Sequence, residues 1–190
     1  MHPANASTLW CIVAVLLLVS PASQALDRTR MDAAVKAHLA VFPTDDIVEE
    51  RFAERASAAD LDGDGVEEIL FMATARCVGA NFDCPNELVV LAATAQPSDQ
   101  AAQRPQADVL AAARTGYTLD SSEQIPGEVR DLRVSNGTID VAFWAQQDSP
   151  ICKPSFSTDQ GRQAITHCPA PGPHRWRYRW ARGTLTKLSP

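Results

Sequence analysis

The sequence predicts an α+β fold, in which an N-terminal helix packs on a mainly antiparallel β-sheet and disulfides stabilise a single domain. Three observations lead to this prediction. One stretch near the N-terminus repeats apolar residues at helical spacing, shorter apolar stretches with alternating polar residues follow it, and four cysteines lie in the same part of the chain. One helix followed by a series of short strands favours a helix that covers one face of a sheet of about six or seven strands.

The first 25 residues contain an apolar run, residues 9–19, that is too short to cross a bilayer. It has the length of the apolar region of a signal peptide, and Ser23 and Ala25 are the small residues that a signal peptidase requires before its cleavage site. The alternative is an apolar core helix. We expect residues 1–25 to be a signal peptide and residues 26–190 to form one secreted or periplasmic domain, with no membrane span after cleavage.

Residues 27–42 predict a helix. Met31, Val35 and Leu39 recur at helical spacing, and several alanines between them favour a helix. Asp27 is a suitable N-cap, and Pro43 cannot continue the helix. Residues 44–59 fit either a second short helix or the approach to a strand, and we favour a strand over the last six or so residues.

The segment from Asp60 to Glu68 reads Asp-Leu-Asp-Gly-Asp-Gly-Val-Glu-Glu and is the one specific motif in the chain. Carboxylates at alternate positions converge on one point when the backbone coils around it, and a glycine at the sixth position permits the turn. Calcium prefers six to eight oxygen ligands. We therefore predict a Ca²⁺ site whose ligands are Asp60, Asp62, Asp64, the Val66 carbonyl and Glu68. The alternative is an acidic turn that holds no metal.

The loop is not an EF-hand, because Phe71 stands at the twelfth position and a strand is expected after the loop. Residues 59–71, ADLDGDGVEEILF, instead resemble the calcium loops of FG-GAP and VCBS-type secreted modules. Together with residues 75–93, they are similar to small bacterial periplasmic proteins in which a cysteine-containing hairpin follows such a loop. The resemblance implies structural calcium and no assigned activity. Those modules occur in several copies that form a propeller, whereas this chain has one loop, so a propeller is not implied.

Residues 66–75 and 87–95 are apolar runs that predict a hairpin around an intervening loop. That loop holds two of the four cysteines of residues 26–190, and an even number in an exported chain indicates two disulfides. Three pairings are open. We favour the pairs that are closest in sequence, because each closes a short loop, although a zinc site is the alternative. The favoured pairs are Cys77–Cys84 and Cys152–Cys168.

Residues 96–107 predict a surface loop, residues 108–114 a short strand or helical turn, and residues 116–128 a further loop. Residues 129–144 predict a hairpin, because apolar and polar residues alternate on both sides of Asn136-Gly137, a dipeptide that suits a type I′ turn.

Residues 145–173 predict a long loop, and residues 174–180 the last strand, with Gly183 turning the chain after it. Three aromatic residues of this strand alternate strictly with Arg175, Arg177 and Arg179. The arginines are candidate partner-binding residues, because they suit an anionic glycan or a carboxylate-bearing protein. The alternative is a half-buried strand whose arginines only face solvent.

The formal net charge of −6 lies within residues 26–190, and an acidic domain is repelled by phosphate backbones, which argues against nucleic acid as a partner. The chain lacks the hydrolase, zinc-protease and phosphate-loop motifs, so we expect no catalytic residues and no enzyme. The sequence therefore favours an exported calcium-binding structural or interaction module with an unidentified protein or glycan partner. An exported inhibitor or ligand-binding protein that uses the disulfide loops or the arginine strand is the alternative.

Overall fold

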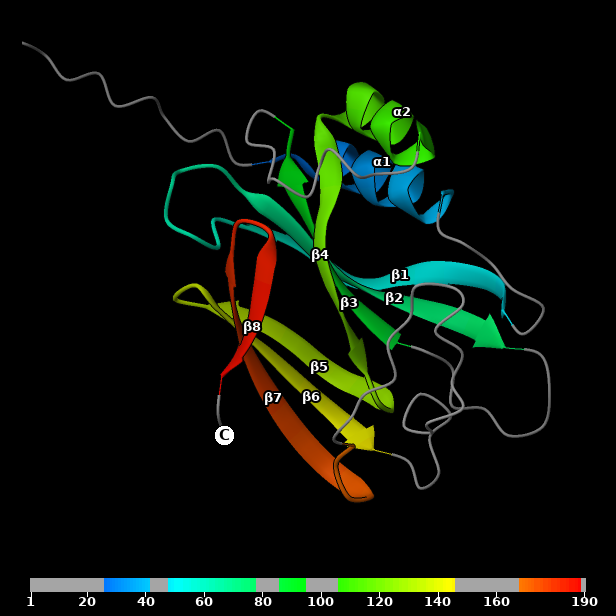
Figure 1. Ribbon diagram of the computed structural model, residues 1–190, viewed down its shortest axis with the longest axis vertical. Helices are drawn as coiled ribbons and strands as arrows, with labels where there is room; N and C mark the ends of the chain where they lie inside the picture. The colour runs from blue at the N-terminus through cyan, green and yellow to red at the C-terminus, as the bar shows by residue number, and fades with distance from the viewer. Residues whose placement is uncertain (1–25, 42–47, 78–85, 95–105, 146–167, 189–190) are drawn as a thin grey trace, which may run out of the picture.

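Two antiparallel sheets and two helices are arranged in three layers in the computed structural model, which describes residues 26–41, 48–77, 86–94, 106–145 and 168–188 (Figure 1). The first sheet has the strand order β1-β2-β3-β4 and the second the order β5-β6-β7-β8. All neighbouring strands are antiparallel. The elements are α1 (Arg28–Leu39), β1 (Val48–Ala59), β2 (Glu68–Cys77), β3 (Asn86–Ala93), α2 (Gln106–Thr115), β4 (Tyr117–Ile125), β5 (Glu128–Ser135), β6 (Thr138–Ala145), β7 (Gly172–Ala181) and β8 (Thr184–Leu188).

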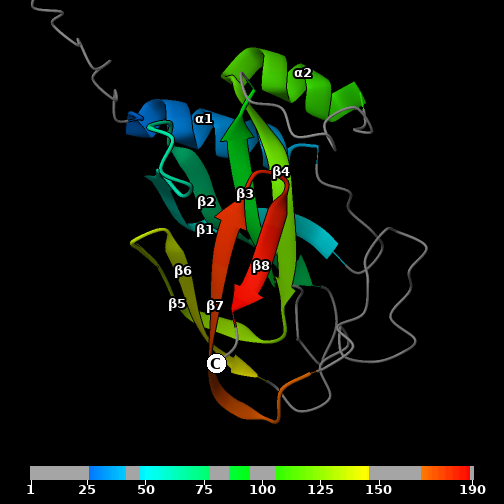
Figure 2. The same cartoon turned by 60° about the vertical axis from the view of Figure 1, so that its left-hand side comes forward.

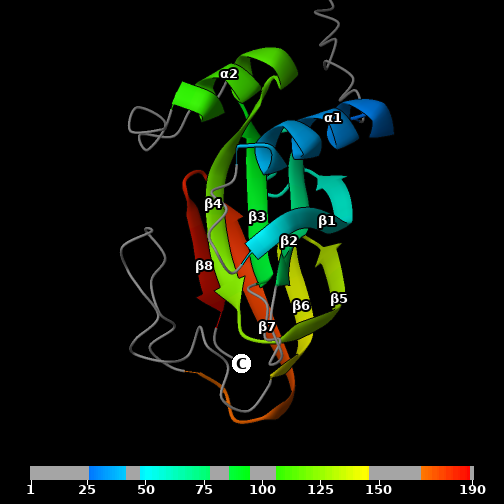
Figure 3. The same cartoon turned by 90° about the vertical axis from the view of Figure 1, so that its right-hand side faces the viewer.

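Helix α1 begins as the sequence predicts, because the Asp27 carboxylate accepts a hydrogen bond from the Arg30 backbone N–H at 3.0 Å. Its buried face contains Met31, Ala34 and Val35, which pack against the first sheet. Both helices lie on the side of this sheet that faces away from the second sheet (Figure 3). The predicted N-terminal helix over a sheet is therefore confirmed.

Strands β2 and β3 are buried on both faces, which explains their continuous apolar runs. Ile69 and Phe71 of β2 belong to the cluster beneath α1, whereas Leu70 and Met72 belong to the cluster between the two sheets. This second cluster is the main core. Its largest members from the second sheet are Phe143, Tyr178 and Trp180.

Both predicted hairpins are present. Strands β2 and β3 pair from Ile69↔Leu91 to Thr74↔Asn86. Strands β5 and β6 are joined by Asn136 and Gly137, whose φ angles of 50° and 67° are both positive, as a type I′ turn requires.

Three of the predictions about the architecture are wrong. Residues 174–180 are not the last strand, because β8, Thr184–Leu188, follows β7. The strands form two stacked sheets rather than one, because the inner faces of both sheets carry large apolar side chains that cover each other. Residues 116–128 are not a loop: β4 occupies most of this segment and pairs with β3 along its length. Of the two readings open for residues 108–114, the structure has the helix α2, and residues 44–59 contain the strand β1.

The signal-peptide prediction and most of the cysteine predictions fall outside the described residues. No complete disulfide lies within them: Cys168 is disulfide-bonded, whereas the side chains of Cys77, Cys84 and Cys152 are outside the described part of the chain. The pairing therefore stays a prediction. Neither described helix has the length and hydropathy needed to cross a bilayer.

Candidate metal centre

The loop between β1 and β2 lies at one end of the sandwich and touches both sheets. Leu61, 4% exposed, inserts into the core between the sheets. The β5–β6 turn of the second sheet passes so close that a Cβ on Gly137 would lie 3.0 Å from the Leu61 carbonyl oxygen. A contact that stiffens this loop would therefore act on both layers.

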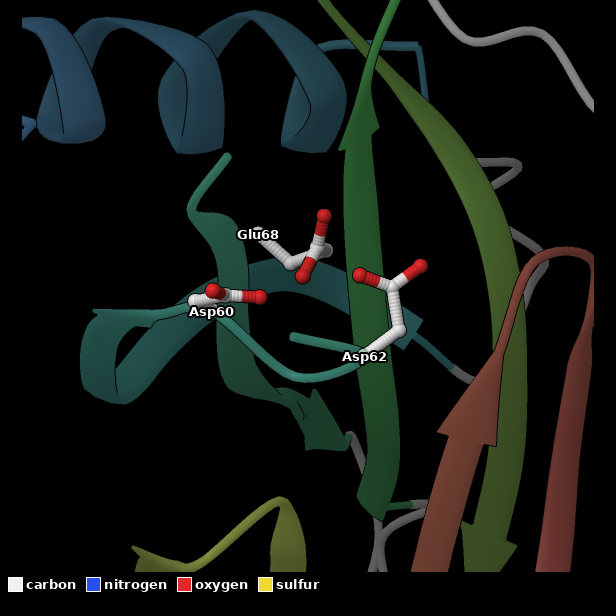
Figure 4. Close-up of side chains that lie close together, drawn as sticks. All are labelled: Asp60, Asp62 and Glu68. Carbon is white, nitrogen blue, oxygen red and sulfur yellow. The ribbon is translucent and has the colours of Figure 1, made fainter. Parts of the chain in front are cut away.

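Three carboxylates of the loop converge (Figure 4). One oxygen from each of Asp60, Asp62 and Glu68 lies within 4.8 Å of the others. Asp60 and Asp62 are exposed residues of the loop, although only 17% of the Asp62 side chain is exposed, whereas Glu68, at the start of β2, is only 1% exposed. The group thus has a solvent-facing side and a buried side. An ion could enter from solvent and contact the buried Glu68 carboxylate.

The Asp60 carboxylate organises the loop backbone. Its Oδ1 accepts hydrogen bonds from the backbone N–H groups of Gly63 (2.7 Å) and Asp64 (3.1 Å), and its Oδ2 accepts one from Gly65 (3.0 Å). Gly63 and Gly65 have φ angles of 84° and 88°, which a residue with a Cβ adopts only under strain. The glycines of the motif therefore allow the chain to coil around Asp60, as the sequence predicts.

Glu68 is the buried member of the group. Its Oε2 accepts a hydrogen bond from the Leu61 backbone N–H at 2.9 Å. The pKa of Glu68 is raised to about 7, mainly by burial and also by the negative charges of Asp62, Asp64 and Asp60, while the Leu61 hydrogen bond acts in the opposite direction. A cation bound beside this carboxylate would favour its ionised form.

Arg182, in the turn between β7 and β8, meets the loop from the second sheet. Its Nη2 lies 2.8 Å from Asp64 Oδ2, and its Nε lies 3.6 Å from Asp62 Oδ2. The guanidinium partly neutralises Asp62 of the cluster and the neighbouring Asp64. Arg182 is not predicted from the sequence, because no sequence pattern indicates that a residue 118 positions from Asp64 lies beside the loop.

The structure brings together three of the four carboxylates that the sequence predicts as ligands. Asp64 instead directs Oδ2 to Arg182, while its Oδ1 accepts a hydrogen bond from the Val66 backbone N–H at 2.8 Å. The converging donors are all carboxylate oxygens, which suit a hard cation such as Ca²⁺ or Mg²⁺ better than zinc or copper. The residues present therefore fit the predicted ion, with Asp64 needing to turn from Arg182 to join them.

The candidate partner-binding arginines lie on β7 and do not belong to this loop. Arg175, Arg177 and Arg179 are exposed on β7, and the aromatic residues between them point the other way: Tyr178 and Trp180 are fully buried and Trp176 is half-buried. The strand is thus amphipathic, as both interpretations of its sequence require.

Comparison of the chain with protein-family models, with curated proteins and with solved structures finds no match. The similarity to FG-GAP and VCBS-type loops therefore rests on the residues of the loop alone.

Proposed function

We propose that this chain is an exported calcium-binding module with a structural and interaction role and no catalytic activity. The convergence of Asp60, Asp62 and Glu68 in a loop that contacts both sheets carries this proposal. An ion held by these carboxylates would offset their mutual repulsion and fix the loop against the β5–β6 and β7–β8 turns. Its main effect would be on stability.

Calcium is the ion that we propose, for two reasons. The donors are oxygens in a flexible, solvent-facing loop, whereas Mg²⁺ requires a closer and more regular octahedron. Extracellular modules also function with calcium dissociation constants of about 10⁻⁴–10⁻³ M, so a weak calcium site would suffice outside the cell. The similarity to FG-GAP and VCBS-type loops, the expected signal peptide and the two expected disulfides all agree with an exported protein.

Calcium is expected to raise the thermal stability of the mature, oxidised protein. A ligand at ten times its dissociation constant stabilises the native state by about 1.4 kcal/mol, which corresponds to a rise in Tm of roughly 3–6 °C in a domain of this size. Calorimetric melts in millimolar CaCl₂ and in chelator measure this difference.

Asp60→Asn keeps a hydrogen-bond acceptor for the loop backbone but removes one ligand charge, so it should abolish most of the calcium-dependent rise in Tm. Asp32→Asn, on the exposed side of α1, is the matched control and should leave the rise unchanged. The proposal is refuted if the wild-type protein shows no binding heat and no rise in Tm with calcium. An undiminished rise in Asp60→Asn would also refute it.

Arg182→Gln is expected to strengthen calcium binding several-fold while lowering the Tm of the metal-free protein slightly. The guanidinium is half-exposed, so its ion pairs contribute little stability, but it competes with an ion for Asp62 and Asp64. Isothermal titration with CaCl₂ measures the affinity, and Arg179→Gln is the control for loss of a positive charge. Weaker binding in Arg182→Gln would show instead that the arginine positions the ligands.

A further inference from the structure

The outer face of the second sheet carries no helix among the described residues, because both helices pack on the first sheet (Figure 2). The strand register identifies the side chains that share this face, since residues directly opposite in an antiparallel pair point to the same side. Arg175, Arg177 and Arg179 of β7 lie opposite Ala142, Asp140 and Thr138 of β6, respectively. The three arginines therefore form a line along the middle of an open face.

The positive charge of the arginine line is only partly neutralised by its neighbours. The arginines of β5 have close acidic partners, because Arg133 Nε lies 2.7 Å from Asp131 Oδ2 and Arg130 Nη2 lies 2.7 Å from Glu128 Oε2. On β7, Arg175 lies 3.9 Å from Asp140, and within the described residues Arg177 and Arg179 make no ion pair. Among the described residues, Asp140 is thus the one acidic cross-strand partner of the three arginines, so the line keeps a net positive charge in an acidic protein.

Besides Asp140, which lies opposite Arg177, the line has hydroxyl groups and an exposed aromatic ring beside it. Thr138 and Thr186 flank Arg179 from the two neighbouring strands. Trp144, opposite Pro173 at the end of the line, is 48% exposed although it is a large apolar side chain. An exposed indole beside polar groups offers a flat apolar surface with a polar edge, a combination common in binding sites.

We propose that this face, defined by Trp144, Arg175, Arg177, Arg179 and Thr186, binds an acidic polysaccharide whose sugars carry carboxylates. Same-face residues of a strand are about 6.6 Å apart, so the arginines span about 13 Å and Trp144 extends the site to about 20 Å. Guanidinium groups at this spacing bind carboxylates of successive sugars, the threonines bind sugar hydroxyls, and the indole packs against the apolar face of a sugar ring.

An acidic polysaccharide fits this face better than the other polyanions. Duplex DNA carries one charge per about 1.7 Å and meets an acidic protein with strong repulsion away from the arginines. The carboxylates of an acidic polypeptide would pair with the arginines, but such a polypeptide has no sugar ring to pack against the exposed tryptophan aligned with them. The proposal is independent of the calcium site, because none of the five residues belongs to the loop at 60–68.

The test is a titration of the mature, oxidised protein with an oligogalacturonate of about six sugars in calcium-containing buffer, followed by calorimetry and tryptophan fluorescence. We expect saturable binding that weakens with salt. The double variant Arg177→Gln/Arg179→Gln should bind at least about 10-fold more weakly and with a flatter salt dependence. Trp144→Ala should bind about 5-fold more weakly with an unchanged salt dependence.

Arg133→Gln is the matched control, because it removes a positive charge from β5, where the arginine already has an acidic partner; it should change the affinity less than twofold. Three results would overturn the proposal: no binding of oligogalacturonate at low salt, equal binding of a neutral dextran oligomer, or equal or tighter binding of polyglutamate or single-stranded DNA. Because every substituted side chain is exposed, each variant should melt within a few degrees of the wild type, which confirms that it folds.

Discussion

Gly127→Ala is expected to lower the free energy of unfolding by at least about 4 kcal/mol, the largest effect of any single substitution proposed for this protein. Gly127 connects β4 to β5 and thus the first sheet to the second. Its φ is 137°, and a Cβ added to it would lie 2.1 Å from the Trp144 carbonyl oxygen and 2.9 Å from the Ala145 Cα. Both are backbone atoms, so the end of β6 has to move to make room.

The movement would also disturb the contacts around the connection, because the Gly127 carbonyl accepts a hydrogen bond from the buried Asn86 side chain and its N–H donates to Ile125. Chemical and thermal unfolding measure the loss. For a domain of this size, 4 kcal/mol corresponds to a fall in Tm of roughly 8–16 °C.

Gly116→Ala is the matched control. Gly116 also has a positive φ, 77°, but a Cβ there meets no atom within 4 Å, so only backbone strain of about 1–2 kcal/mol is expected. If both variants lose the same stability, steric overlap at the connection between the sheets is not the cause.

Local sequence patterns were sufficient for the elements whose side chains follow a simple period. The helix at the N-terminus, the β2–β3 hairpin and the β5–β6 turn each depend on residues close together in the chain, and each was predicted near its observed bounds. The coil of the loop after Asp60 was also predictable, because its glycines and carboxylates determine it locally.

Strand β4 was missed because its sequence, YTLDSSEQI, is mostly polar. Buried polar residues such as Thr118 and Asp120 do not indicate a strand until their partners on distant strands are known. The same limit applies to the second sheet. An alternating strand shows which of its faces is buried but not which element covers that face, so two stacked sheets and one larger sheet have the same sequence signature.

The candidate site was predictable only in part for a similar reason. The spacing of Asp60, Asp62 and Glu68 indicates convergence, but the partner of Asp64 is Arg182, which the fold brings from the other sheet. Charge compensation between distant segments leaves no periodic signal in a single sequence.

Asp120→Ala is expected to cost about 3–5 kcal/mol, because it removes the acceptor for two hydrogen bonds between the sheets. Asp120 is 5% exposed, and it is the extra residue of a β-bulge in β4, between the partners of Val90 and Leu91. Its Oδ2 accepts from Trp180 Nε1 at 2.8 Å and from the Gly183 backbone N–H at 2.7 Å. Alanine would leave a buried indole N–H without a partner and free the β7–β8 turn.

A double-mutant cycle separates this hydrogen bond from a general packing defect. Trp180→Phe removes the indole donor, so Asp120→Ala should cost about 1–2 kcal/mol less in that background than in the wild type, as measured by urea unfolding. Asp120→Asn keeps an acceptor oxygen and should lose less stability than Asp120→Ala. Additive costs in the cycle would mean that Trp180 and Asp120 stabilise the protein independently.

The β7–β8 turn contains both Gly183, which donates to Asp120, and Arg182, which pairs with the acidic loop. Asp120→Ala should loosen this turn and thereby change the calcium affinity of the loop. An unchanged affinity would show that other contacts hold the turn.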